Sequence, residues 1–177
     1  MSEAKKVKDS AKKETLFELL EELLAENRKI LLFSQFTTML SIIEDEVKKR
    51  KINYAKLTGQ TRKREEAIAK FKQDDCNLFL ISLKAGGVGL NLIEADTIIH
   101  YDPWWNPAVE NQATDRAHRI GQTKTVFVYK LVVENSIEEK IITLQDSKKE
   151  LYKGLYDKTK EEKMPFQGDD LIALLRQ

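Results

Sequence analysis

Leu78-Phe79-Leu80-Ile81-Ser82 runs directly into Leu83-Lys84-Ala85-Gly86-Gly87-Val88-Gly89-Leu90-Asn91-Leu92. The first segment is a short, almost entirely apolar run, which is typical of a strand that is buried on both faces. The second segment contains three glycines, and glycine tolerates backbone conformations that other residues avoid. Together the two segments predict a buried strand that passes through a glycine-rich turn toward a helix.

Four further apolar runs lie on the two sides of this stretch, and each predicts a strand. They are Ile30–Phe33, Ile52–Leu57, Thr97–Tyr101 and Val126–Leu131. We expect the last two to be buried strands. Segments with helical spacing of apolar residues lie between the runs. Because strands that are apolar on both faces and alternate with helices favour a parallel sheet covered by helices, the expected fold class is α/β.

The helices predicted between these strands are amphipathic. They cover about residues 11–27, the segment through Leu40, Ile43 and Val47, a segment with Ile68 and Phe71 on its inner face and Thr61 as its cap, and about residues 107–118. Ser136-Ile137-Glu138-Glu139 has the spacing of a capping box. A long helix is therefore expected from about residue 136.

The chain is expected to form one domain with short extensions. Residues 1–10 are rich in lysine and poor in apolar residues, so we expect a disordered terminus or a linker there. Residues 11–160 are expected to form the domain, including the long helix from about 136. Residues 161–177 are expected to form a loop and a short C-terminal helix.

Charge and composition restrict the possible functions. The 30 Lys and Arg residues nearly balance the 29 Asp and Glu residues, so any DNA contact must use a local patch. Cys76 is the one cysteine, and His100 and His118 are the two histidines, which is too few for a disulfide or a metal site. We expect both histidines to be structural. No apolar stretch approaches the roughly 20 residues that span a bilayer. An intracellular protein without membrane contact is expected, cytoplasmic in a prokaryote and nuclear in a eukaryote.

The segment most informative about chemistry is Gln112-Ala113-Thr114-Asp115-Arg116-Ala117-His118-Arg119-Ile120-Gly121-Gln122. Arg116 and Arg119 lie three positions apart, which places both on one face of a helix. Two guanidinium groups on one face can bind a single polyanion such as a terminal phosphate. By spacing alone, a pair of solvated surface arginines is the commoner explanation.

The complete segment, Gln-x-x-Asp-Arg-x-x-Arg followed by Ile-Gly-Gln, resembles motif VI of the Swi2/Snf2 branch of superfamily 2 helicases. Other segments resemble motifs of this family in the expected order: Leu32–Phe36 resembles motif IV, Ser82–Leu92 motif V, and Tyr101–Pro107 the linking segment. Leu57-Thr58-Gly59 is similar to a minor motif. The resemblance covers about residues 15–160.

This resemblance implies a RecA-like parallel sheet flanked by helices, a P-loop NTPase-like fold in the form of the second helicase lobe, which lacks the phosphate loop. It also implies a motor that hydrolyses ATP to translocate on double-stranded DNA and to remodel protein–DNA complexes. The chain is expected to be the C-terminal lobe of that motor.

The resemblance further implies roles in ATP hydrolysis. Arg119 would be the principal arginine finger and Arg116 its companion at the γ-phosphate, since guanidinium groups stabilise the charge that develops there. The residues expected to face the ATP cleft are Gln112, Asp115, Gly89 and Asn91. Within this set, Gln112 would couple the nucleotide to the position of the lobe, and Asp115 would pin an arginine or cap the local helix.

DNA contacts are expected from the loops that follow the strands. The expected residues are Ser34, Gln35, Thr58, Gly59, Ser82, Lys84, Gly86, Gly87, Trp104 and Trp105. Amides, hydroxyls and a lysine can contact the phosphates of a DNA backbone. The alternatives are an ordinary glycine-rich turn and simple turn capping by the hydroxyls. For the tryptophans we expect packing within the motor or against the sugar and backbone of DNA, rather than stacking on a base.

Two parts of a complete motor do not occur in the sequence. None of the seven glycines is followed by lysine, and no acidic pair follows an apolar strand as the Mg²⁺ motif would. We therefore expect ATP and Mg²⁺ to be bound mainly by an N-terminal lobe of the same motor. That lobe and double-stranded DNA are the expected partners, and the isolated chain is expected to be inactive as an ATPase. The alternative is a standalone nucleic-acid-binding or protein-interaction module with a degenerate RecA-like fold.

Overall fold

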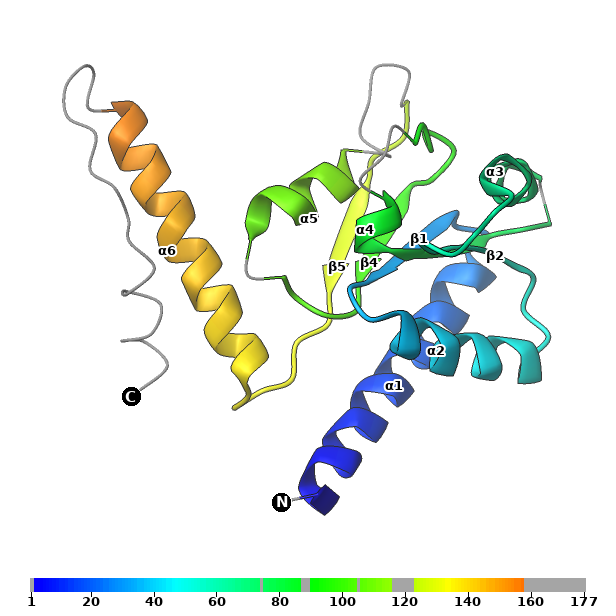
Figure 1. Ribbon diagram of the computed structural model, residues 1–177, viewed down its shortest axis with the longest axis horizontal. Helices are drawn as coiled ribbons and strands as arrows, with labels where there is room; N and C mark the ends of the chain where they lie inside the picture. Colours follow the sequence, from blue (N-terminus) through cyan, green and yellow to red (C-terminus); the bar gives the residue numbers. More distant parts are fainter. Residues whose placement is uncertain (1, 74, 87–89, 105, 116–122, 158–177) are drawn as a thin grey trace. The chain divides into compact units, whose positions relative to one another are not determined.

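The computed structural model describes residues 2–73, 75–86, 90–104, 106–115 and 123–157, and within these ranges it describes the side chains between residues 11 and 148. Strands of the described part form one five-stranded sheet (Figure 1). They are β1 (Ile30–Ser34), β2 (Tyr54–Leu57), β3 (Leu78–Ser82), β4 (Thr97–His100) and β5 (Phe127–Lys130). All neighbours are parallel, in the order β2-β3-β1-β4-β5. The expected parallel α/β architecture is confirmed.

Helices cover both faces of this sheet (Figure 1). The helices are α1 (Ser2–Ala25), α2 (Thr37–Lys49), α3 (Arg64–Lys72), α4 (Leu83–Gly86), α5 (Pro107–Thr114) and α6 (Ile137–Asp157). One hydrophobic cluster joins α1 and α2 to one face, and a second joins α3, α4 and α5 to the other. The central strands therefore lie between two helical layers.

Strand β1 shows why the apolar runs are unbroken. Successive side chains of a strand point to opposite faces of the sheet. Ile30 and Leu32 pack in the layer of α1 and α2, Leu31 and Phe33 pack in the opposite layer, and all four are fully buried. Burying one such side chain contributes about 1.5–3 kcal/mol. A charged residue at any of these positions would be left unpaired in a core, which the fold would not tolerate.

The prediction of a buried strand at Val126–Leu131 is wrong. Strand β5 is the edge of the sheet, and Phe127 and Val128 on it are 41% and 44% exposed. The guanidinium of Arg28 lies over the Phe127 ring, 4.8 Å from its centroid. A short apolar run does not distinguish a central strand from an edge strand, because both are rich in the same residues.

Helix starts differ from the predictions at two places. Helix α1 begins at Ser2, so the backbone is helical through most of the segment expected to be a disordered terminus or a linker. Alanine, lysine and glutamate, which are common there, favour helix, and no glycine or proline interrupts them. Thr61 does not cap α3, which begins at Arg64 without a side-chain cap. The cap at Ser136 is confirmed, since Ser136 Oγ accepts a hydrogen bond of 3.1 Å from the Glu138 N–H.

The chain divides into two compact units, Met1–Gln145 and Asp146–Gln177. The first unit contains the whole sheet and the first turns of α6. The second begins within α6, and its residues 158–177 lie outside the described part. The expected loop and short helix at 161–177 thus stay a prediction, and so does a domain boundary near residue 160.

Candidate nucleotide and DNA interface

Four loops with predicted site residues begin at the same edge of the sheet. In the parallel register Ser34 pairs with Ser82, Leu57 with Ile81, and Phe33 with His100. The strands β1 to β4 therefore all end at this carboxyl edge, where parallel α/β sheets generally bind ligands. The structure brings these predicted residues to that edge: Ser34, Gln35, Thr58, Gly59, Ser82, Lys84 and Trp104.

The end of β1 is fixed by a buried carboxylate. Ser34 Oγ donates to Asp102 Oδ2 at 2.6 Å, and the Gln35 N–H donates to the same oxygen at 2.9 Å. Ser34 is fully buried, and its hydroxyl also accepts from the Phe36 N–H at 3.1 Å. Burial raises the pKa of Asp102, although both hydrogen bonds act to lower it. The hydroxyl of Ser34 thus caps the turn after β1, which was the alternative to a DNA contact. For the partly exposed Gln35 a DNA contact remains a prediction.

The loop after β2 is a turn closed by two threonines. Thr61 Oγ1 accepts from the Thr58 N–H at 2.9 Å, and Thr58 Oγ1 accepts from the Gln60 N–H at 3.3 Å. A Cβ added at Gly59 would meet no atom within 4 Å. Crowding therefore does not require glycine at this position, and the Gly59 backbone is open to a ligand.

The glycine-rich segment after β3 begins as the short helix α4. Ser82 Oγ accepts from the Ala85 N–H at 3.3 Å, as the capping alternative predicts, while the Lys84 side chain is exposed. Arg64 Nη2 donates to the Ala85 carbonyl at 2.9 Å and so fixes the end of α4. Arg64 was not singled out from the sequence, because its contact is 21 positions away. Gly86 is the last residue of α4, and Gly87 and Gly89 lie outside the described residues.

Helix α5 carries the start of the arginine segment. The helix begins at Pro107, as the sequence predicts, and Asn106 Oδ1 caps it by accepting from the Ala108 N–H at 3.1 Å. Helix α5 contacts α4. Gln112 is exposed on α5, and the exposed Asp115 follows it as the C-cap. Arg116 and Arg119 lie outside the described residues, so their predicted role stays a prediction.

His100 connects the end of β4 to the end of α5. Its Nε2 lies 3.3 Å from Thr114 Oγ1, and its ring stacks on Phe33 with the centroids 5.6 Å apart. Burial lowers the pKa of His100 to about 4, and the Glu110 carboxylate opposes this shift. The imidazole is therefore neutral at neutral pH. The structural role expected for His100 agrees with these contacts, while His118 lies outside the described residues.

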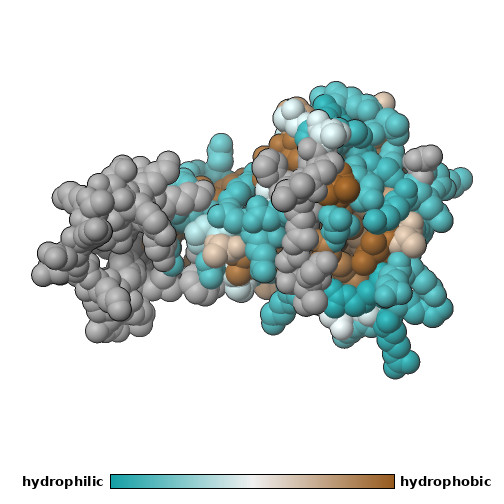
Figure 2. Space-filling view, turned by 90° about the horizontal axis from the view of Figure 1, so that it is seen from above, coloured by the Kyte–Doolittle hydropathy of each residue, from teal (hydrophilic) through white to brown (hydrophobic). Residues whose placement is uncertain are grey.

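Other predicted residues have separate surroundings. Trp104 is partly buried and packs against the core cluster of α3, α4 and α5, and Trp105 lies outside the described residues. Asn91 is exposed in the segment between α4 and β4. Seen from above, the side on which α3, α4 and α5 lie in Figure 1, the surface shows hydrophobic patches among hydrophilic residues (Figure 2).

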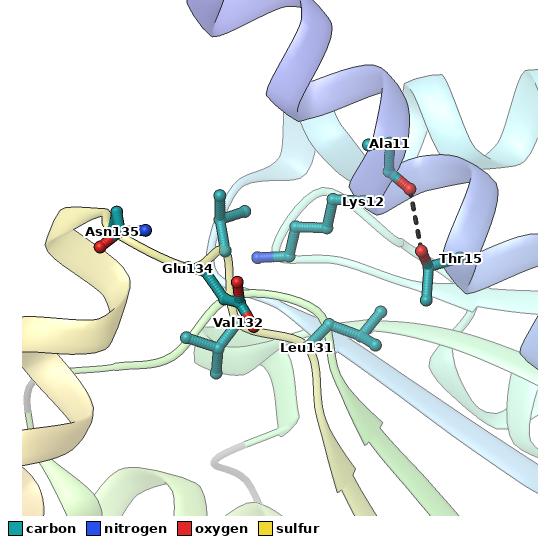
Figure 3. Close-up of a pocket in the computed structure, with 8 residues that line it drawn as sticks. Ala11, Lys12, Thr15, Leu131, Val132, Glu134 and Asn135 are labelled. Atoms are coloured by element: carbon teal, nitrogen blue, oxygen red, sulfur yellow. Dashed lines mark hydrogen bonds between the residues drawn. The ribbon is translucent and has the colours of Figure 1, made fainter.

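A pocket of about 540 Å³ lies between α1 and the segment that follows β5 (Figure 3). Lys12 and Thr15 line it from α1, and residues 131–135 line it from the other side. None of the predicted site residues lines this pocket. Among the described residues, no group of three or more His, Cys, Asp or Glu side chains could hold a metal ion. Within the same part of the chain, no helix is both long and apolar enough to cross a membrane.

A parallel sheet of this order, with a glycine-rich turn after β3 and an arginine-bearing segment after α5, defines the class of RecA-like helicase lobes. The model of the helicase conserved C-terminal domain matches residues 11–121, which is more than half of the chain. The chain belongs to this family, in its Swi2/Snf2 branch.

Two relatives and one solved structure show the degree of similarity. An uncharacterized ATP-dependent helicase of Mycoplasma pneumoniae is 48% identical over 149 residues, which cover 82% of this chain and 14% of the relative. The chromatin-remodeling ATPase INO80 of Arabidopsis thaliana is 46% identical over 142 residues, which cover 78% of this chain and 9% of the relative. The crystal structure of the C-terminal part of the Fun30 ATPase domain has a TM-score of 0.71 at 39% identity, over 75% of this chain and 44% of that one. The RecA-like fold is thereby confirmed, and the chain spans a small part of its curated relatives.

Proposed function

We propose that this chain is the C-terminal lobe of a DNA-dependent ATPase that translocates on double-stranded DNA and remodels protein–DNA complexes. The family and the names of the relatives support this function. The observation that carries it is the common edge of the sheet. The loops with Gln35, Thr58 and Lys84 begin there, and the helix that leads to Arg116 contacts α4, in which the glycine-rich segment begins.

In this proposal the two arginines act on a triphosphate that another lobe holds. ATP and Mg²⁺ bind mainly to the N-terminal lobe, and Arg116 and Arg119 reach the γ-phosphate across the cleft between the lobes. Guanidinium groups there stabilise the charge that develops during phosphoryl transfer. Gln112, Asp115, Asn91 and Gly89 face the same cleft. The exposed positions of the first three leave them accessible to a nucleotide.

The DNA contacts in this proposal come from the strand-end loops. Gln35, the Thr58 turn with Gly59, Lys84 and the glycine backbone bind phosphates, and the tryptophan loop packs against the DNA sugar and backbone. Ser34 and Ser82 support these loops from inside the domain. The N-terminal lobe and double-stranded DNA are thus the proposed partners, and the protein works inside the cell, where DNA and ATP are found.

Reconstitution from separate lobes tests this function. The N-terminal lobe supplied in trans should restore DNA-stimulated ATP hydrolysis with the wild-type chain, while Arg119→Ala should lower the rate by about 10³-fold or more. Arg116→Ala should also lower it. Arg50→Ala is the matched control, because Arg50 pairs with Glu46 at the end of α2, and the rate should not change. DNA-stimulated hydrolysis by the chain alone that survives Arg119→Ala would refute the proposal.

A further inference from the structure

The backbone of Trp104 is held on both sides by buried side chains. Its N–H donates to Glu110 Oε1 at 2.6 Å, and its carbonyl accepts from Gln145 Nε2. Lys130 Nζ donates to Glu110 Oε2 and, at 3.1 Å, to Gln145 Oε1. We call this closed set of hydrogen bonds the Glu110 ring, formed by Trp104, Glu110, Lys130 and Gln145. It joins the linking segment, α5, β5 and α6.

The burial of Glu110 is not explained by stability alone. Glu110 and Gln145 are each only 1% exposed. Burial acts to raise the pKa of Glu110, but the hydrogen bonds from Lys130 and from the Trp104 N–H outweigh it and hold the pKa below its usual value. The buried carboxylate is therefore charged at neutral pH. Removing a carboxylate from water is costly, and well-packed apolar groups in place of such a pair are often equally stable. A fixed geometry is what the charged ring adds.

The Glu110 ring holds α5, and side-chain contacts also fix both ends of this helix. Asn106 caps the start of α5, and Thr114 at its end lies within hydrogen-bond distance of His100. Glu110 lies between these two points, one turn into the helix. Arg116 follows Thr114 by two positions. A displacement of Glu110 would therefore move the Trp104 loop and the start of the arginine segment together.

We propose that Glu110 is a positioning residue that, through Lys130 and Gln145, links the Trp104 loop at the proposed DNA site to α5, the helix that precedes Arg116 and Arg119 in the sequence. This inference rests on the proposed function, because it concerns how DNA contact is coupled to hydrolysis. The ring keeps the loop and α5 in one relative position. DNA bound against the loop then stabilises the arrangement in which the arginines reach the phosphate.

The test measures ATP turnover of the full-length ATPase with and without double-stranded DNA. Glu110→Gln keeps an acceptor for the Trp104 N–H but removes the charge that binds Lys130, and Glu110→Ala removes both. We expect the DNA-stimulated kcat to fall by about 10- to 100-fold in Glu110→Ala, since a misplacement of about 1 Å costs this much. In Glu110→Gln the DNA-stimulated kcat should fall less. The KM for ATP should change little in both, because the other lobe holds the nucleotide.

Glu138→Gln is the matched control. Glu138 forms an ion pair with the buried Lys12, at 2.7 Å, and accepts a hydrogen bond of 3.0 Å from the Val133 N–H, and neither partner belongs to the Glu110 ring. This variant should lower the melting temperature and leave DNA stimulation intact. If the Glu110 variants do not fold, Gln145→Leu is the variant to test. It removes a contact to Trp104 without leaving a buried charge unpaired, and its DNA-stimulated kcat should also fall.

The outcomes separate the two proposals. Loss of turnover in Arg119→Ala, together with a loss of stimulation in the Glu110 and Gln145 variants that exceeds the loss in Glu138→Gln, supports the positioning role. If Arg119→Ala is inactive but DNA stimulates the turnover of the Glu110 and Gln145 variants as strongly as that of Glu138→Gln, the positioning role is overturned and the proposed function stands. If Arg119→Ala retains DNA-stimulated turnover, the proposed function fails, and the inference fails with it.

Discussion

At the scale of single residues, folding keeps the imidazole of His100 neutral. His100 is 1% exposed, and burial lowers its pKa from 6.5 to about 4, against the opposing effect of Glu110. Between pH 6.5 and pH 4 the unfolded chain therefore binds a proton that the folded chain does not. Stability must fall as the pH falls through this window and level off below it. At pH 5 the loss from this residue is about 2 kcal/mol.

Urea denaturation of the wild type and of His100→Gln at pH 7 and pH 5 measures this contribution. Carboxylates that do not interact with His100 titrate alike in both proteins, so their effect cancels in the comparison. The free energy of unfolding should fall by about 2 kcal/mol more in the wild type than in the variant. An equal fall in the two proteins would show that the buried imidazole does not resist protonation.

At the scale of elements, the start of α5 depends on one side chain. Asn106 Oδ1 accepts from the Ala108 N–H, and the residue is extended, with φ −99° and ψ 105°, as an N-cap should be. Asn106→Ala should lower the free energy of unfolding by about 1 kcal/mol, and Asn106→Asp should have little effect. Thermal denaturation of both variants measures this. Asn53→Ala, which removes an exposed loop contact with Asp75 instead, is the control and should cost less.

The elements that the sequence predicts best are those with strictly local signals. Leu78–Ser82 is a strand with the predicted bounds, α5 begins at Pro107 as predicted, and Ser136 caps α6 where its chemistry indicates. The exposure of β5 could not be predicted, because being an edge strand depends on the strand order and not on the run itself. Thr61 has the sequence of a helix cap, yet its hydroxyl closes the turn at Thr58.

In the candidate site, too, the features with local sequence signals were predicted and those that depend on tertiary contacts were not. The motifs predicted which loops meet at the carboxyl edge, because each motif follows a strand and the strands are parallel. They did not predict that the Ser34 hydroxyl would donate a hydrogen bond to Asp102, 68 positions away. They also did not predict that Gln145 would donate to the Trp104 carbonyl, 41 positions away. Such contacts arise from tertiary packing, and the residue types alone carry no signal for them. The Glu110 ring was therefore visible only in the folded domain.

At the scale of the whole molecule, near neutrality limits how this lobe can bind DNA. The net charge is +1, so no long-range field attracts the duplex, and affinity must come from local contacts at the carboxyl edge. Each neutralised phosphate releases counterions, which makes the affinity depend on salt. About three phosphate contacts would give a slope of about −3 in a plot of log affinity against log salt concentration.

Lys84 provides the test of where those contacts lie. Its side chain is exposed on α4, at the edge where the predicted DNA-binding loops begin. Lys84→Ala should weaken binding of any duplex sequence to a similar extent and reduce the magnitude of the salt slope by about 1. Lys49→Ala removes another exposed lysine, which pairs with Glu46 at the far end of α2, and it should leave the slope unchanged. Fluorescence anisotropy with a labelled duplex over a range of salt concentrations measures both. A slope that is the same in the wild type and Lys84→Ala would place the DNA somewhere other than this edge, because a lysine that neutralises a phosphate cannot be removed without losing its share of the counterion release.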